Sequence, residues 1–107
     1  MCIHIGIPTI TSITYDQISS EIFTLTCIST GGPATNVTWT LNGSEITYDA
    51  NHVLTQTVVN TRTAEYNNTL TVTGREPGNY QCTVSNARGR ATSQTLDIRG
   101  QSYSKME

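Results

Sequence analysis

The run Gly78-Asn79-Tyr80-Gln81-Cys82-Thr83-Val84-Ser85-Asn86 decides the fold of this 107-residue chain. Tyrosine, cysteine and valine alternate in it with polar residues, which is typical of a β-strand that has one face in a core. A second cysteine, Cys27, lies 55 residues upstream of Cys82, and the single tryptophan, Trp39, lies between them. In a sandwich of two sheets, cysteines can join facing strands, an indole can pack on the sulfurs, and a tyrosine hydroxyl can tie a corner of the backbone.

The composition favours an all-β domain. Threonine occurs 20 times, mostly at every second position of apolar and β-branched runs, and no stretch shows a helical period. Charged residues are only 13% of the chain and the net charge is −2, so no basic stripe is available to neutralise phosphates. Nucleic acid is therefore not an expected partner, and the length fits a single domain.

Alternating runs separated by turn residues predict about eight strands. The strongest turn signal is Asn42-Gly43, which is typical of a two-residue hairpin. We expect Leu70 to point inward, and Leu96 and Ile98 to be buried in the last strand. The expected strands are 9–14, 21–29, 37–41, 45–48, 53–60, 64–73, 79–86 and 91–99. Residues 8–99 would form the domain, with an extension or linker at 1–7 and a linker or added tail at 100–107.

Glu76, Gly78, Tyr80 and Cys82, at every second position, together with Trp39, resemble the immunoglobulin superfamily, with Glu in place of the usual Asp. The resemblance runs from about Pro8 to Arg99. It implies a Greek-key sandwich of two sheets, with the family's strands A, B, E and D in one and G, F, C and C′ in the other.

The subtype follows from the middle of the chain. The link between 48 and 53 is too short for the extra strand of antibody variable domains, which favours the I-set or C2 type. The run Thr71-Val72-Thr73-Gly74-Arg75-Glu76-Pro77-Gly78 is similar to domains of early-branching animals, sponges in particular.

The resemblance implies a disulfide between Cys27 and Cys82, and a core that contains Trp39, Tyr80 and Leu70. A structural disulfide indicates an oxidising compartment. The third cysteine, Cys2, is then a free thiol, one half of an intermolecular bridge, or a residue added to the native sequence.

The chain carries no signature of catalysis. Its two histidines, His4 and His52, have no sequence neighbour that would make them a base or a ligand, and we expect both to be surface residues. No nucleophile motif, phosphate-binding loop or metal-ligand spacing is present. We therefore expect no enzymatic activity, no cofactor and no metal.

No secretory signal and no apolar run of about 20 residues is visible, so we expect a domain taken from a longer chain.

Three sequons predict N-glycosylation, at Asn36, Asn42 and Asn67. Strand parity places Asn36 on the outward face with Thr38, and Asn67 on the outward face opposite to Leu70. The alternative is that Asn42-Gly43 is only a turn and that the other two are chance matches in a threonine-rich chain.

Two surfaces are candidates for binding. The same parity places four neutral polar side chains on one sheet face, where they are cheap to desolvate and could contact a second copy: Thr38, Thr40, Gln81 and Thr83. At one end of the sandwich, Arg88 and Arg90 flank a glycine and could bind a carboxylate or a sulfated glycan. The alternatives are a solvated face and a solvated hairpin tip.

The resemblance implies an extracellular binding module of a cell-surface receptor, similar to those of receptor tyrosine kinases, or of an adhesion protein. Its partner would be another protein or a second copy, and it would reach the membrane only through the parent chain. The alternative is a structural spacer with no ligand of its own. An antigen-receptor variable domain is disfavoured by the short link and by the absence of Gly-x-Gly in the last strand. A carbohydrate-binding sandwich is disfavoured because the chain has only seven aromatic residues.

Overall fold

The computed structural model describes residues 6–99, which form nine β-strands and no helix. Cys2, His4 and most of the predicted terminal segments lie outside the described residues. The strands are β1 (Thr9–Gln17), β2 (Ile22–Thr30), β3 (Asn36–Leu41), β4 (Ser44–Glu45), β5 (His52–Asn60), β6 (Glu65–Thr73), β7 (Gly78–Asn86), β8 (Gly89–Thr92) and β9 (Leu96–Ile98).

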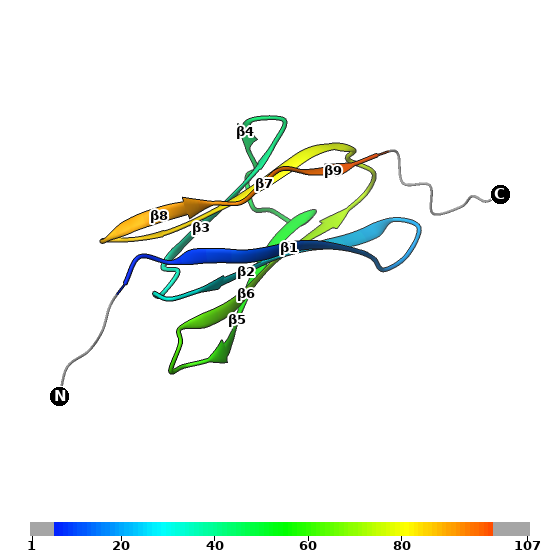
Figure 1. Cartoon of the computed structure of the whole chain (residues 1–107). Helices are drawn as coiled ribbons and strands as arrows, with labels where there is room; N and C mark the ends of the chain where they lie inside the picture. The colour runs from blue at the N-terminus through cyan, green and yellow to red at the C-terminus, as the bar shows by residue number, and fades with distance from the viewer. Residues whose placement is uncertain (1–5, 100–107) are drawn as a thin grey trace.

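The strands form two antiparallel sheets that pack face to face (Figure 1). One sheet has the order β1-β2-β6-β5, and the other has the order β4-β3-β7-β8, with β9 also paired to β7. These orders correspond to A, B, E, D and to C′, C, F, G. The predicted all-β, two-sheet sandwich is confirmed.

The predicted last strand, 91–99, is interrupted at Ser93. The Ser93 hydroxyl accepts from the backbone N–H of Cys82 at 3.0 Å, and the Ser93 carbonyl accepts from the Gln81 side chain at 2.9 Å. Because a side chain replaces a carbonyl in the ladder, the strand divides into β8 and β9. Ile98 is buried as expected, but Leu96 is only half-buried.

The predicted strand 45–48 is shorter than expected, because β4 ends at Glu45. Ile46 is buried and its N–H still donates to the Trp39 carbonyl at 2.8 Å. Beyond it, the Tyr48 hydroxyl, not the backbone, donates to the Val37 carbonyl at 2.7 Å. The chain leaves one sheet here to cross to β5.

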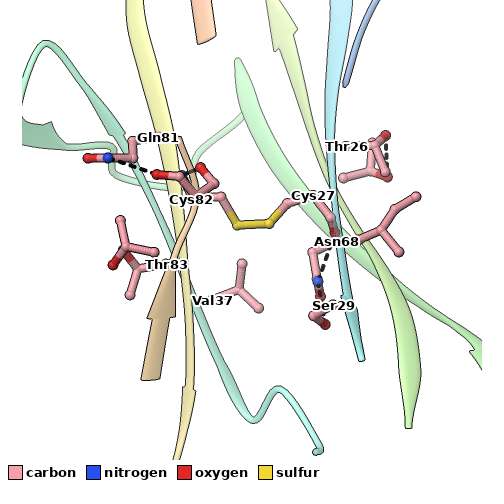
Figure 2. The surroundings of a disulfide bond; sticks show 12 residues. Thr26, Cys27, Ser29, Val37, Asn68, Gln81, Cys82 and Thr83 are labelled. Carbon is pink, nitrogen blue, oxygen red and sulfur yellow. Dashed lines mark hydrogen bonds between the residues drawn. A yellow bond between two sulfur atoms is a disulfide. The ribbon is translucent and has the colours of Figure 1, made fainter. Parts of the chain in front are cut away.

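A disulfide joins the two sheets through the middle of the sandwich (Figure 2). It links Cys27 of β2 to Cys82 of β7 with a Cα–Cα distance of 6.4 Å, so the implied pairing is confirmed. Trp39 pairs with Cys82 in the ladder and therefore points to the same inner face. Trp39, Tyr80 and Leu70 are fully buried.

The corner before β7 is fixed by Tyr80, whose hydroxyl donates to the Glu76 carbonyl at 2.6 Å. Phe23 meets the Tyr80 ring edge-on, with centroids 6.0 Å apart. Gly78 has φ 145°, and a Cβ there would lie 2.7 Å from a Leu41 methyl and 2.8 Å from Asn42 Oδ1. Only glycine fits this corner without displacing its neighbours.

A polar network extends from the buried Asn68 side chain to the edge strand β5. Asn68 is fully buried, and its Nδ2 donates to the Cys27 carbonyl at 3.0 Å and to Ser29 Oγ at 3.1 Å. Gln56 Nε2 donates to Asn68 Oδ1 and to the Ala34 carbonyl, both at 2.8 Å. The network connects β2, β5, β6 and the loop before β3, and every polar atom of the Asn68 side chain is paired.

Replacing Asn68 by alanine is expected to lower the free energy of unfolding by about 1–3 kcal/mol, because Gln56 and Ser29 lose a buried partner. Asn67→Ala, one residue earlier and facing the opposite way, should cost less than about 0.5 kcal/mol. Urea unfolding of protein from a bacterial host, which leaves the sequon unmodified, measures both. Equal losses would show that the buried network contributes no more to stability than the outward-facing Asn67 side chain.

Candidate functional site

The four predicted contact residues lie together on the outer face of the β3–β7 sheet. Register pairs Thr38 with Thr83 and Thr40 with Gln81, and Figure 2 shows Gln81 and Thr83 on the side of β7 that faces away from the disulfide. All four side chains are half-buried. The Thr83 and Thr92 hydroxyls lie 3.1 Å apart, which extends the row onto β8. The centre of this outer face is a neutral layer of hydroxyl and amide groups.

The outer face carries opposite charges at diagonal corners. Glu45 pairs with Thr40 at the β4 edge, while Arg90 pairs with Ser85 at the β8 edge, so both share the face but sit at opposite ends. Both residues are exposed, and neither has an ion-pair partner among residues 6–99. Strand spacings put the two corners about 20 Å apart. The expectation of a nearly uncharged face holds only for its centre.

A hollow of about 350 Å³ opens on the same face, where the break between β8 and β9 leaves β7 without a neighbouring strand. Beyond it, Asp97 and Arg99 pair with each other at 2.9 Å. The hollow is lined by neutral hydrogen-bonding groups and one glycine: Thr40, Asn42, Gly43, Asn79, Gln81 and Thr95. It could accept a neutral polar group from a partner.

Arg88 and Arg90 lie on different surfaces, and neither lies at the centre of the outer face. Asn86 shapes their turn by accepting from the Arg88 N–H at 2.8 Å, and it holds the neighbouring loop by donating to the Pro33 carbonyl at 3.1 Å. Arg88 is therefore exposed at the tip of the sandwich. Arg90 lies one strand position inward, on the outer face itself.

Two sequons border the outer face and one lies on the other sheet. Asn36 is exposed at the first residue of β3, in the row of Ser85. Asn42 is exposed in the hairpin at φ 52°, and its Oδ1 accepts from the Asn79 N–H at 2.9 Å. Asn67 is half-buried on β6, paired with Ile28 of β2 and Thr57 of β5.

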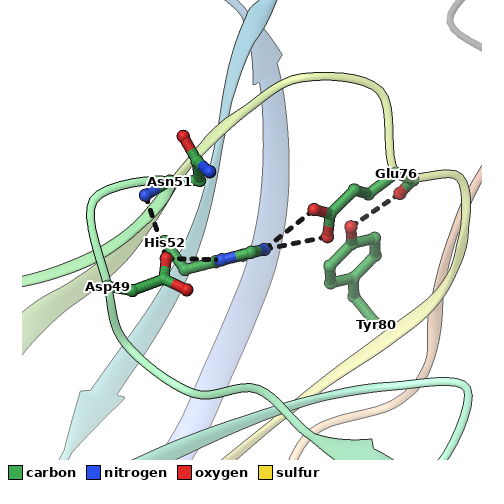
Figure 3. A network of polar contacts seen from close by, with 5 residues as sticks. All are labelled: Asp49, Asn51, His52, Glu76 and Tyr80. Carbon is green, nitrogen blue, oxygen red and sulfur yellow. Dashed lines mark hydrogen bonds and ion pairs between the residues drawn. The ribbon is translucent and has the colours of Figure 1, made fainter.

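His52 is not the isolated surface histidine that the sequence suggested. Its Nδ1 lies 2.9 Å from Asp49 Oδ1, and its Nε2 lies 2.9 Å from Glu76 Oε1 (Figure 3). Its side chain is only 15% exposed. Glu76 is 24 residues away in sequence and belongs to the Tyr80 corner, so no local pattern could reveal this contact. The network ties the start of β5 to the loop before β7.

The charges of this network fix its dependence on pH. The hydrogen bond to Glu76 raises the pKa of His52 above 6.5 against the opposing effect of burial, and Asp49 raises it further. The hydrogen bond to His52 lowers the pKa of Asp49 below 3.8. A raised histidine pKa stabilises the fold fully below pH 6.5 and less as pH rises through the folded pKa, whereas a lowered aspartate pKa stabilises it above pH 3.8. Both contributions are therefore present between about pH 4 and 6.5.

We call this network the His52 clamp, because it joins the start of β5 to the loop before β7. No group of histidine, cysteine, aspartate and glutamate side chains within residues 6–99 is placed to hold a metal ion. Residues 6–99 contain no helix that could span a bilayer.

An NMR titration should give His52 a pKa above 6.5, and Glu76→Gln should lower it, because the largest favourable interaction of the imidazolium is removed. The stability of the wild type should fall as pH rises from 6 to 8. Most of this slope should disappear in His52→Gln, which also identifies the resonance. A His52 pKa at or below 6.5 would contradict the clamp.

Comparison with known proteins agrees with this geometry. No curated protein matches the sequence. One similar solved structure is the crystal structure of Down Syndrome Cell Adhesion Molecule (DSCAM) isoform 1.30.30, N-terminal eight Ig domains, with 20% identity and a TM-score of 0.66. The match covers 84% of this chain but only 12% of that chain, so it supports the fold alone. A family model described as immunoglobulin domain matches residues 7–86, and the chain therefore belongs to the immunoglobulin domain family.

Proposed function

We propose that the domain is an extracellular recognition module of a cell-surface receptor, similar to receptor tyrosine kinases, or of an adhesion protein. We further propose that it binds a second copy through the outer face of the β3–β7 sheet. The family, whose members typically act by binding and not by catalysis, supports a protein-interaction role. The disulfide supports an oxidising compartment. The observation that carries the homophilic form is the diagonal placement of Glu45 and Arg90.

Two copies of this face are complementary to one another. A half-turn about an axis in the plane of the contact, perpendicular to the Glu45–Arg90 diagonal, brings Glu45 of each copy over Arg90 of the other. The threonine and glutamine rows meet in the centre, where no charge must be desolvated. Contacts of this kind are isologous and close on a dimer, and charge pairs at the rim favour the correct register.

The second candidate function is a spacer that separates other domains of a modular chain. The Asn68 network and the His52 clamp support it, because both stabilise the sandwich internally and use no ligand. The two candidates differ in one measurable property, which is self-association through the outer face.

We also propose that Asn36, Asn42 and Asn67 carry glycans in the native source. Asn36 and Asn42 are exposed, whereas Asn67 is half-buried between neighbouring strands. Peptide mass spectrometry of protein from a secretory host should find Asn36 and Asn42 more fully modified than Asn67. Absence of any glycan on all three would contradict the proposal, and predominant modification of Asn67 would contradict its order.

Charge reversal tests the face-to-face dimer. Glu45→Arg and Arg90→Glu should each weaken dimerisation by about tenfold, because each places like charges at both rim contacts. The double swap should restore most of the affinity, since it restores opposite charges. Sedimentation velocity over a concentration series measures this.

Glu21→Arg and Arg75→Glu are matched controls, because they change the net charge equally at exposed positions off this face. A wild type that stays monomeric at every concentration would favour the spacer. A double swap as weak as the single changes would place the contact elsewhere.

A further inference from the structure

Strand β5 forms one outer edge of the β1-β2-β6-β5 sheet (Figure 1). Within residues 6–99, β5 forms its ladder with β6 alone. Three exposed valines lie on this strand: Val53 (46%), Val58 (51%) and Val59 (51%). An exposed, apolar edge strand is a template for pairing with another strand.

The other edges of the sandwich are protected, whereas β5 is not protected between residues 53 and 58. β4 has only two residues, and the edge formed by β8 and β9 is broken at Ser93 and carries Arg90 and Asp97. β1 has a bulge between Ile10 and Ser12 and carries Asp16. β5 contains no proline and no aspartate, glutamate, lysine or arginine, and its only bulge lies near the end, between Val58 and Asn60. Charges, prolines and bulges are the usual means of protecting an edge.

The backbone groups that face the free edge can be identified from His52. Its N–H and carbonyl both bond to Asp49, at 3.2 and 2.9 Å, on the side away from β6. Because these groups alternate sides along an antiparallel strand, those of Leu54 and Gln56 also point to the free edge. Gln56 is exposed, but its side-chain Nε2 donates to Asn68 Oδ1 and to the Ala34 carbonyl, which anchors this part of β5 to the rest of the sandwich.

We propose that β5 pairs antiparallel with β5 of a second copy, across a twofold axis at Thr55. In this register Leu54 of each copy forms a hydrogen-bonded pair with Gln56 of the partner subunit, which uses the free backbone groups. Thr55 faces its own equivalent, and Val53 faces the partner's Thr57. These neutral β-branched pairs stabilise a ladder, and no like charges meet.

A second copy is the occupant because the strand is its own complement. Pairing of identical antiparallel strands is isologous and closes on a dimer that joins the two four-stranded sheets into one. The contact is short, so the dimer is weak and transient. It lies on the sheet that the proposed face-to-face dimer does not use, and it stands whether or not that dimer forms.

The position of Thr55 on the axis gives a specific experiment. In a Cys2→Ser, Glu45→Arg background, which removes the third cysteine and weakens the outer-face contact, we compare the unchanged edge with Thr55→Lys and Thr55→Glu. Each substitution alone places two like charges opposite one another, so the dissociation constant should rise about tenfold or more. An equimolar mixture of the two should dimerise about as well as the unchanged edge, because lysine then faces glutamate. Thr55 is exposed, and circular dichroism checks that each variant is folded.

Thr14→Lys, on the exposed side of the other long edge strand, is the matched control and should leave dimerisation unchanged. Hydrogen exchange at low and high concentration should show slower exchange at 53–57 in the concentrated sample. The proposal is overturned if the background protein is monomeric at all concentrations, if Thr14→Lys acts like Thr55→Lys, or if the mixture does not recover. Protection confined to 36–45 and 79–92 would also overturn it, and would support the outer face instead.

Discussion

The structure depends on the covalent link between Cys27 and Cys82. The core around it contains one phenylalanine, one tryptophan and one tyrosine, with smaller apolar residues completing it. On the chain-entropy model, closing a loop of 55 residues stabilises a fold by about 4 kcal/mol. That is a large part of the total stability expected of a small domain. The core also accommodates the buried Asn68 beside the disulfide, because every polar atom of its side chain has a hydrogen-bond partner.

The sequence predicted those structural features that depend on residues close together in the chain. Alternation of apolar and polar side chains located the strands except for the early end of β4 and the division of the last strand into β8 and β9. The family resemblance carried by Gly78-x-Tyr80-x-Cys82 implied the corner and the sheet order. It could not predict that Ser93 would substitute its hydroxyl for a carbonyl, or that Tyr48 would reach the Val37 carbonyl by its side chain. Both contacts depend on where two distant segments of the chain pack together. The alternation of side chains along a strand contains no information about such contacts.

The candidate surfaces show the same division. Parity alone grouped Thr38 with Thr40, and Gln81 with Thr83, but the corner charges emerged only when register aligned β4 and β8 with the central strands. The partner of His52 was out of reach because Glu76 approaches through a loop. Identifying the free edge of β5 likewise required the sheet order, because the sequence of an uncharged strand does not show whether the strand lies at the edge or at the centre of a sheet.

The path of the chain through the disulfide has a mechanical consequence. In Figure 1 the start of β1 and the end of β9 lie at opposite ends of the sandwich, so a pull on the two would shear the ladders β1–β2 and β7–β9 instead of unzipping them. Even after rupture, the segment between Cys27 and Cys82, which are 55 positions apart, would stay looped. At about 3.4 Å per residue, roughly 190 Å of contour length could never be extended under tension while the sulfurs remain bonded.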